Sequence, residues 1–172
     1  MIEKILDLDS HLFLYLNNLG SQYYDNFWIF LSRTEANVML YLVVLIAYIY
    51  SINNKKRTKI LFHLIIAIAI LITISDQTSN LFKDSFQRLR PCYNELISDS
   101  LRLVKDSCGG RYGFFSAHAS NSFSLAIFFG LLLRSSNNLL ILLFAIYAFL
   151  ISYSRIYLGV HYPIDILVGI IF

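Results

Sequence analysis

The chain has 172 residues, of which 57% are hydrophobic and only 15% are charged, and its net charge is +3. Soluble domains average about 45–50% apolar and about 25% charged residues, so this composition points away from them and toward one membrane domain over residues 1–172. The basic residues separate apolar runs and do not alternate with aromatic residues along one face, which argues against a nucleic-acid partner.

Residues 4–32 mix apolar and polar side chains closely. Leucines and isoleucines stand among Asp, Asn and His, and a second apolar run follows Asp25. We expect two short amphipathic helices within residues 1–35, lying in the headgroup region with Tyr23, Tyr24 and Trp28 as interfacial anchors. The alternative is one additional span of poor apolar character.

Five apolar stretches could enter a bilayer, namely residues 36–52, 60–82, 117–133, 138–153 and 164–172. A bilayer core about 30 Å thick needs about 20 helical residues, with about 17 acceptable, and the first four stretches meet this once their ends are counted. The fifth reaches only about 13 Å, so either the natural chain continues beyond Phe172, which we favour, or this stretch only dips into the membrane. The expected fold is an all-α integral-membrane bundle of about five transmembrane helices, the last one short.

Charge between the apolar stretches predicts the orientation of the chain. Four basic residues crowd the short loop between the first two stretches, namely Lys55, Lys56, Arg57 and Lys59. The positive-inside rule places that loop in the cytoplasm and, by alternation, residues 83–115 outside. This outer loop also holds six basic residues, which the rule disfavours and which therefore need a chemical reason: Lys83, Arg88, Arg90, Arg102, Lys105 and Arg111.

Three polar clusters fall on the same predicted face of the membrane. They are Lys83 to Arg90-Pro91, Ser116-Ala117-His118, and Ser154-Arg155 through His161 to Asp165. Their cations offer fixed charge and donors that match phosphate oxygens. Ser116 and the N–H groups that open the third span add neutral donors, and a helix N-terminus favours an anion. Asp165 follows His161 by one helical turn, so it is placed to hold the imidazole in one tautomer.

The spacing within these clusters resembles the signatures of the PAP2 (type 2 phosphatidic acid phosphatase) superfamily, which are KxxxxxxRP, PSGH and SRxxxxxHxxxD. The first matches at Lys83, Arg90 and Pro91, and the third at Ser154, Arg155, His161 and Asp165. The second keeps Ser116 and His118, while Phe115 replaces its Pro and Ala117 its Gly. Alanine retains the backbone N–H, so an oxyanion role survives unless the site requires a positive φ. The resemblance covers about residues 76–165.

The resemblance implies a two-step phosphoryl transfer that uses neither a metal nor a cofactor. His161 would attack phosphorus and form a phosphohistidine, with Asp165 orienting its ring. His118 would protonate the leaving group and then activate water. Charge on the equatorial oxygens would be stabilised by Lys83, Arg90, Ser116, Arg155 and the backbone of Ala117 and His118.

Further polar residues surround these clusters. Asp76 lies inside the second span, where a carboxylate is costly, and we expect it to hydrogen-bond within the bundle or to support a basic ligand, not to perform catalysis. The sequence leaves the role of Arg88 open between contact with a headgroup and contact with water alone. Cys92 and Cys108 are either two free thiols or, as we favour, a disulfide that closes a loop of about 16 residues and contributes about 3 kcal/mol.

The leading hypothesis is an enzyme of the bacterial inner (cytoplasmic) membrane that hydrolyses a lipid phosphate or pyrophosphate at the periplasmic face, with that lipid and the bilayer as its partners. The family's substrates include undecaprenyl pyrophosphate, phosphatidylglycerol phosphate, phosphatidic acid and lipid A phosphates. We favour undecaprenyl pyrophosphate, because a short-looped bundle leaves little protein for a large saccharide headgroup. One alternative is a phosphatase of lipid A or of phosphatidylglycerol phosphate. The others are a lipid phosphotransferase, which the same residues serve, and a non-catalytic lipid-phosphate binder, which has no need for two histidines and an Asp.

Overall fold

The computed structural model describes residues 2–105, 107–134 and 139–172, and over these ranges the chain is helical and forms no β-strand. The elements are α1 (Ile2–Asn18), η1 (Gln22–Tyr24), α2 (Asp25–Leu31), α3 (Thr34–Ser51), α4 (Asn54–Phe86), η2 (Pro91–Tyr93), α5 (Ala117–Leu132), α6 (Leu139–Tyr157) and α7 (Pro163–Ile171). The all-α fold expected from the sequence is confirmed. Residue 138, the first of the fourth apolar stretch, lies outside the described residues.

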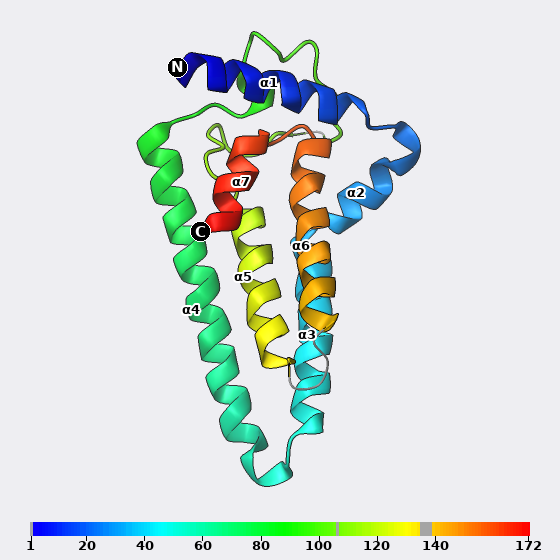
Figure 1. Ribbon diagram of the computed structural model, residues 1–172, viewed down its shortest axis with the longest axis vertical. Coiled ribbons are helices and arrows are strands. Elements are labelled where there is room, and N and C mark those ends of the chain that lie inside the picture. Colours follow the sequence, from blue (N-terminus) through cyan, green and yellow to red (C-terminus); the bar gives the residue numbers. More distant parts are fainter. Residues whose placement is uncertain (1, 106, 135–138) are drawn as a thin grey trace.

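Four long helices, α3 to α6, run along the long axis of the molecule as one bundle (Figure 1). α1 lies across one end of this bundle, and the short α7 stands at that same end beside α5 (Figure 1). The turn between α3 and α4, which leads into the basic residues Lys55 to Lys59, lies at the opposite end. The two ends of the bundle therefore differ in structure.

Among the described residues, three helices are long and apolar enough to cross a membrane, namely α3, α4 and α6. α5 is apolar too, but it has only 16 residues. α4 has 33 residues, about 50 Å, so it extends past a bilayer core of about 30 Å and carries Lys83 in its last turn. Large side chains such as Val43 and Ile74 stay exposed on α3 and α4, as lipid-facing side chains do.

Aromatic and small side chains fill the interior between α3, α5 and α6. Tyr41 stacks on Phe129 with ring centroids 5.0 Å apart, and Phe144 lies 6.0 Å from the same tyrosine. A Cβ at Gly130 would lie 2.7 Å from Cγ1 of Ile141, so α5 and α6 approach each other closely at this glycine. Small residues at helix contacts allow the close van der Waals packing that holds membrane helices together.

Polar side chains join α4 to α5. Ser75 Oγ donates to Ser120 Oγ at 2.7 Å, and the amide of Asn121 donates to Asp76 Oδ1 at 2.8 Å. Away from water each buried polar group needs such a partner, so these bonds fix the register between the two helices. The expectation that Asp76 hydrogen-bonds within the bundle is confirmed.

The N-terminal residues form helices that pack on the end of the bundle. Phe13 of α1 is fully buried, with its ring 5.4 Å from that of Tyr162. Trp28 of α2 packs against the rings of Tyr153 and Tyr157, both 5.1 Å away, whereas Tyr23 is 86% exposed. Residues 4–32 thus form the helices α1 and α2 and not one continuous span. Trp28 packs α2 against α6. A headgroup location for α1 stays a prediction.

Candidate active site

The three polar clusters meet at the end of the bundle that α1 covers. Lys83 lies in the last turn of α4, Arg90 precedes η2, Ser116 and His118 begin α5, Arg155 lies in the last turn of α6, and His161 and Asp165 flank the start of α7. His161 lies within electrostatic range of Arg90, Arg155 and Lys83. Residues from four helices and one loop thus lie around the imidazole of His161.

His161 and Asp165 form a buried pair. His161 Nδ1 lies 3.4 Å from Asp165 Oδ2, and the two side chains are 3% and 0% exposed. The same carboxylate oxygen accepts the backbone N–H of Tyr162 at 3.0 Å, within a capping box that begins α7. An ionised carboxylate accepts, so Nδ1 carries the hydrogen and Nε2 keeps its lone pair for attack.

The environment of His161 also sets its charge. Burial lowers the pKa of its imidazole well below the ordinary value, and the nearby charges of Arg90, Arg155 and Lys83 lower it further. A cation so close to other cations is disfavoured, so the ring stays neutral at physiological pH. A neutral imidazole with a free nitrogen is the form that acts as a nucleophile.

Three cations of the site, Lys83, Arg90 and Arg155, have no carboxylate as an ion-pair partner among the described residues. Arg155 is buried, donates to the hydroxyl of Ser32 and leaves its Nε unpaired. Arg90 donates to two backbone carbonyls, those of Tyr112 at 3.2 Å and Cys108 at 2.9 Å. Within residues 2–105, 107–134 and 139–172, none of the three cations forms an ion pair with a carboxylate. Such uncompensated positive charge favours an anionic ligand.

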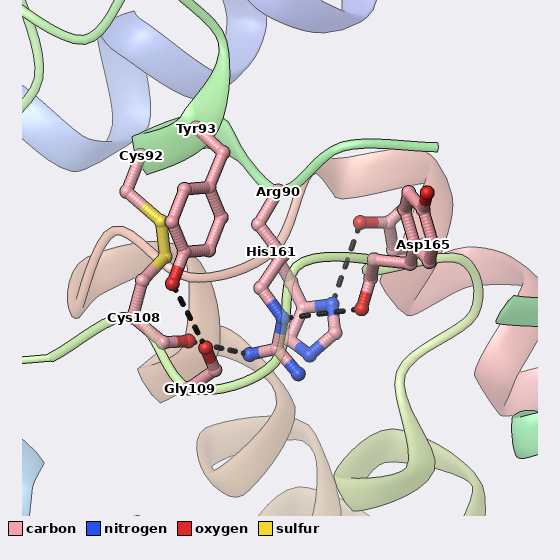
Figure 2. The surroundings of a disulfide bond; sticks show 8 residues. Arg90, Cys92, Tyr93, Cys108, Gly109, His161 and Asp165 are labelled. Atoms are coloured by element: carbon pink, nitrogen blue, oxygen red, sulfur yellow. Dashed lines mark hydrogen bonds and ion pairs between the residues drawn. A yellow bond between two sulfur atoms is a disulfide. The ribbon is translucent and has the colours of Figure 1, made fainter. Parts of the chain in front are cut away.

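A disulfide joins Cys92 to Cys108, with the two Cα atoms 6.3 Å apart. The bridge holds together the two segments that position Arg90, whose N–H donates to the carbonyl of Arg111 at 3.1 Å. Figure 2 shows the Arg90 side chain lying between the disulfide and the His161–Asp165 pair. Of the two alternatives for the cysteines, the structure has the bridge, and the bridge belongs to the frame of the site.

Gly113 is a site residue that the sequence did not reveal. A Cβ on Gly113 would lie 3.1 Å from Arg90 Cγ, 3.2 Å from Asp165 Oδ2 and 3.6 Å from His161 Nδ1. This glycine therefore lets the backbone approach the His–Asp pair closely. The chain has seven glycines, and the sequence alone does not show that this one lies against the site.

Ser116 caps α5. Its hydroxyl accepts the N–H of Ala119 at 3.4 Å, and the residue is fully buried, so contact of this hydroxyl with a phosphate stays a prediction. Ala117 follows in helical conformation, and the one non-glycine residue with positive φ in the described ranges is Gln87. The exchange of Gly for Ala at position 117 therefore introduces no backbone strain.

His118 lines a cavity of about 560 Å³ between α3, α4, α5 and α6. Most of the other lining side chains are apolar, including those of Leu42, Ile72 and Leu125. His118 also lies within electrostatic range of Arg155 and His161. One imidazole thus borders both the cationic site and an apolar cavity within the bundle.

Arg88 has two protein partners that the sequence did not anticipate. Its guanidinium bridges two buried carboxylates, Asp165 at 2.8 Å and Asp9 of α1 at 2.6 Å. The sequence did not single out Asp9, because its exposed neighbour Asp7 looks the same in an amphipathic helix. No group of three or more His, Cys, Asp or Glu side chains suited to a metal occurs in the described part of the chain.

Comparison with known proteins places the chain in a family. The model of the PAP2 superfamily matches residues 64–172. A lipid A 4'-phosphatase of Bacteroides thetaiotaomicron is 37% identical over 173 residues, which cover 99% of this chain and 74% of that protein. A lipid A 4'-phosphatase of Porphyromonas gingivalis is 34% identical over 170 residues, which cover 98% of this chain and 70% of that protein.

Two solved structures share the fold. LpxE of Aquifex aeolicus has a TM-score of 0.67 and 22% identity, with 94% of this chain and 87% of that one covered. A PAP2-type phosphatidylglycerolphosphate phosphatase of Bacillus subtilis has a TM-score of 0.70 and 14% identity, with 97% and 79% covered. The chain belongs to the PAP2 superfamily and is a multi-pass membrane lipid phosphatase.

Proposed function

We propose that this enzyme hydrolyses the phosphate of a lipid A-type glycolipid through a phosphohistidine on His161. The observation that carries the proposal is the buried His161–Asp165 pair among three cations that lack a carboxylate partner in the described ranges. Two relatives that match nearly the whole chain are lipid A 4'-phosphatases, which supports the glycolipid as substrate.

In the first step, the Nε2 lone pair of His161 attacks phosphorus and the bond from phosphorus to the lipid oxygen breaks. His118, which the dianionic phosphate of the bound substrate keeps protonated, gives this proton to that oxygen as it leaves. The imidazole gains positive charge as its bond to phosphorus forms, and the carboxylate of Asp165 stabilises this charge through Nδ1–H. The lipid departs as a neutral alcohol.

In the second step, His118 takes a proton from water, whose oxygen attacks the phosphorus of the phosphohistidine. The nitrogen–phosphorus bond breaks, inorganic phosphate leaves and His161 returns to its neutral form. Lys83, Arg90 and Arg155 stabilise the charge on the equatorial oxygens in both steps, because they are fixed in place before the reaction. The N–H groups of Ala117 and His118, at the positive end of the α5 dipole, stabilise the same negative charge.

The cavity beside His118 suits an acyl chain of the substrate. Its lining is mostly apolar, and it reaches from the bundle interior to an imidazole of the site. We therefore propose the glycolipid as substrate in place of undecaprenyl pyrophosphate, which the short loops had favoured. That reasoning assumed that the protein must enclose the whole saccharide, which a site at the end of the bundle does not require.

The site faces the periplasm in this proposal. The basic residues Lys55 to Lys59 lie at the end of the bundle opposite the site (Figure 1), and basic loops stay in the cytoplasm. An oxidising compartment also suits the Cys92–Cys108 disulfide. Both features support an inner-membrane enzyme with its site on the outer side.

The test is phosphate release from a panel of lipid phosphates, in detergent with EDTA present. Wild type is expected to act on lipid A, His161→Ala to lose turnover while still binding lipid, and His63→Ala to stay active, because His63 lies far along α4 and contacts Lys59. Loss of wild-type activity in EDTA would contradict the histidine mechanism. Transfer of the phosphate to a second lipid instead of water would identify a phosphotransferase.

A further inference from the structure

Asp9 is buried on a helix that otherwise shows most of its surface. Only 3% of the residue is exposed, whereas the side chain of Asp7 on the same helix is 76% exposed and pairs with the similarly exposed His11. Burying a carboxylate is costly unless it is paired. The position of Asp9 therefore needs a reason that the amphipathic character of α1 does not supply.

Both oxygens of Asp9 have partners near the active site. Oδ2 accepts from Arg88 at 2.6 Å, and Oδ1 accepts the backbone N–H of Ile164, in the first turn of α7, at 3.0 Å. The other side of the Arg88 fork donates to Asp165 Oδ1 at 2.8 Å. Asp9 thus holds both the start of α7 and the arginine that pairs with the carboxylate behind His161.

Arg88 is confined on a third side by an aromatic ring. Its Cζ lies 4.1 Å from the centroid of Tyr162, and its side chain is only 18% exposed. A guanidinium held by two carboxylates and a ring face has little freedom to turn. The hydrogen bond that Arg88 donates to Asp165 is therefore held in one direction.

The contacts form a chain of alternating charge from α1 to the nucleophile. Asp165 uses Oδ1 for Arg88 and Oδ2 for Tyr162 N–H and His161 Nδ1, so its orientation depends on Arg88. We propose that Asp9 and Arg88 are positioning residues of the phosphoryl transfer, which hold Asp165 at the angle that keeps His161 ready to attack. Asp9 lies outside the three signatures and Arg88 stands at a variable position within the first, and α1 is then part of the catalytic unit.

This inference rests on His161 as nucleophile, which belongs to the proposed function. A purely structural role for Asp9 is the competing explanation, since the residue also fastens α1 to the bundle. The chain provides a matched comparison for that role. Asp25 fastens α2 through Arg102, at 2.7 and 2.9 Å, without contact to Asp165 or His161.

The experiment compares Asp9→Asn with Asp25→Asn and Asp7→Asn in the full-length protein in detergent. Asn keeps the size of Asp and an acceptor for the Ile164 N–H, so Asp9→Asn is expected to fold. We expect its kcat to fall about 10- to 100-fold with KM within about twofold, as for other residues that orient a reacting group. Asp25→Asn is expected to lower the unfolding temperature with kcat unchanged, and Asp7→Asn to change neither.

A second readout does not depend on turnover. The chain has four histidines, so ring ¹⁵N signals assigned with His161→Gln report which nitrogen of His161 carries the hydrogen. Wild type should show one tautomer, with Nδ1 protonated, and Asp9→Asn and Arg88→Gln should show a mixture. If His161 keeps one tautomer in both variants, or if Asp9→Asn and Asp25→Asn behave alike, the inference is wrong. A wild type inactive on lipid A overturns only the substrate proposal.

Discussion

The backbone N–H of Ser116 donates a 3.0 Å hydrogen bond to the backbone carbonyl of Asp165. Ser116 caps α5, which carries His118, and Asp165 lies in the first turn of α7 beside His161. One main-chain contact therefore joins the two helices that hold the proposed acid–base histidine and the partner of the proposed nucleophile. The spacing of the two imidazoles depends on how closely α7 packs on α5.

Gly169 makes this close packing possible. A Cβ at Gly169 would lie 2.6 Å from the carbonyl oxygen of Ser116 and 3.1 Å from Ala119 Cβ, and the backbone atom cannot move aside by a rotamer change. We expect Gly169→Ala to lower stability by about 1–3 kcal/mol and kcat at least about tenfold, because a displaced α7 misplaces His161. Thermal unfolding and turnover per folded molecule measure the two effects.

The control for Gly169→Ala is Gly110→Ala, because a Cβ at Gly110 would meet no atom within 4 Å. This variant should keep both the stability and the turnover of wild type. Wild-type turnover in Gly169→Ala would show that the approach of α7 to α5 does not position the site.

The low pKa of His161 predicts the acidic limb of the pH profile. Burial and the charges of Arg90, Arg155 and Lys83 keep the ring neutral. As the pH is lowered, kcat/KM should therefore stay constant to a pH below about 6.5, the ordinary pKa of histidine. Lys83→Met removes one of these charges and therefore raises the pKa of His161. The ring then becomes protonated at a higher pH, and we expect the limb to move toward neutral by up to about one pH unit.

The pH profile is compared with that of Lys56→Met, a change at the other end of the bundle, which should leave the limb in place (Figure 1). Lys83→Met also weakens phosphate binding, so the position of the limb is read from profiles normalised to their maxima. A limb that moves to lower pH, or not at all, contradicts the assignment of His161 as the neutral nucleophile.

The disulfide is expected to act through Arg90. Replacing Cys92 and Cys108 by Ser releases a loop of about 16 residues, which in the chain-entropy model lowers stability by about 3 kcal/mol. The carbonyl of Cys108 is also one of the two that hold the Arg90 guanidinium, so kcat/KM should fall as well. Denaturation in urea and the kinetics of the double variant measure both effects.

These are the chain's two cysteines, so labelling of non-reduced, unfolded protein is unambiguous. A bridged protein takes up no alkylating reagent before reduction and reacts at both thiols afterwards. Alkylation of both thiols without reduction would contradict the bridge, and it would weaken the periplasmic orientation.

The parts of this structure that the sequence predicts are those marked by local patterns. Long apolar runs predict the helices α3 to α6, and fixed spacing within one segment predicts Lys83 with Arg90 and His161 with Asp165 as site residues. Contacts between distant segments are different, because nothing local marks Asp9 as the partner of Arg88, or Gly113 as the residue against Asp165. The end of α4 also lay beyond the apolar run, since a helix continues for as long as its backbone bonds and packing allow.

The apolar cavity predicts where the tail of the substrate lies. Leu125 lines the cavity, whereas Ile127 on the same helix is 53% exposed on the outer face of α5. Leu125→Trp fills part of the space, so kcat/KM for a long-chain lipid phosphate should fall about tenfold, roughly 1.4 kcal/mol of lost tail binding. Ile127→Trp meets lipid instead and should leave kcat/KM unchanged.

A short-chain phosphate ester separates loss of the tail site from damage to the catalytic centre. Leu125→Trp should hydrolyse this substrate at close to the wild-type rate, because only the long tail needs the cavity that His118 borders. Equal losses on both substrates would place the damage at His118. Equal long-chain kinetics for Leu125→Trp and Ile127→Trp would mean that the tail lies elsewhere, on the lipid-facing surface of the bundle.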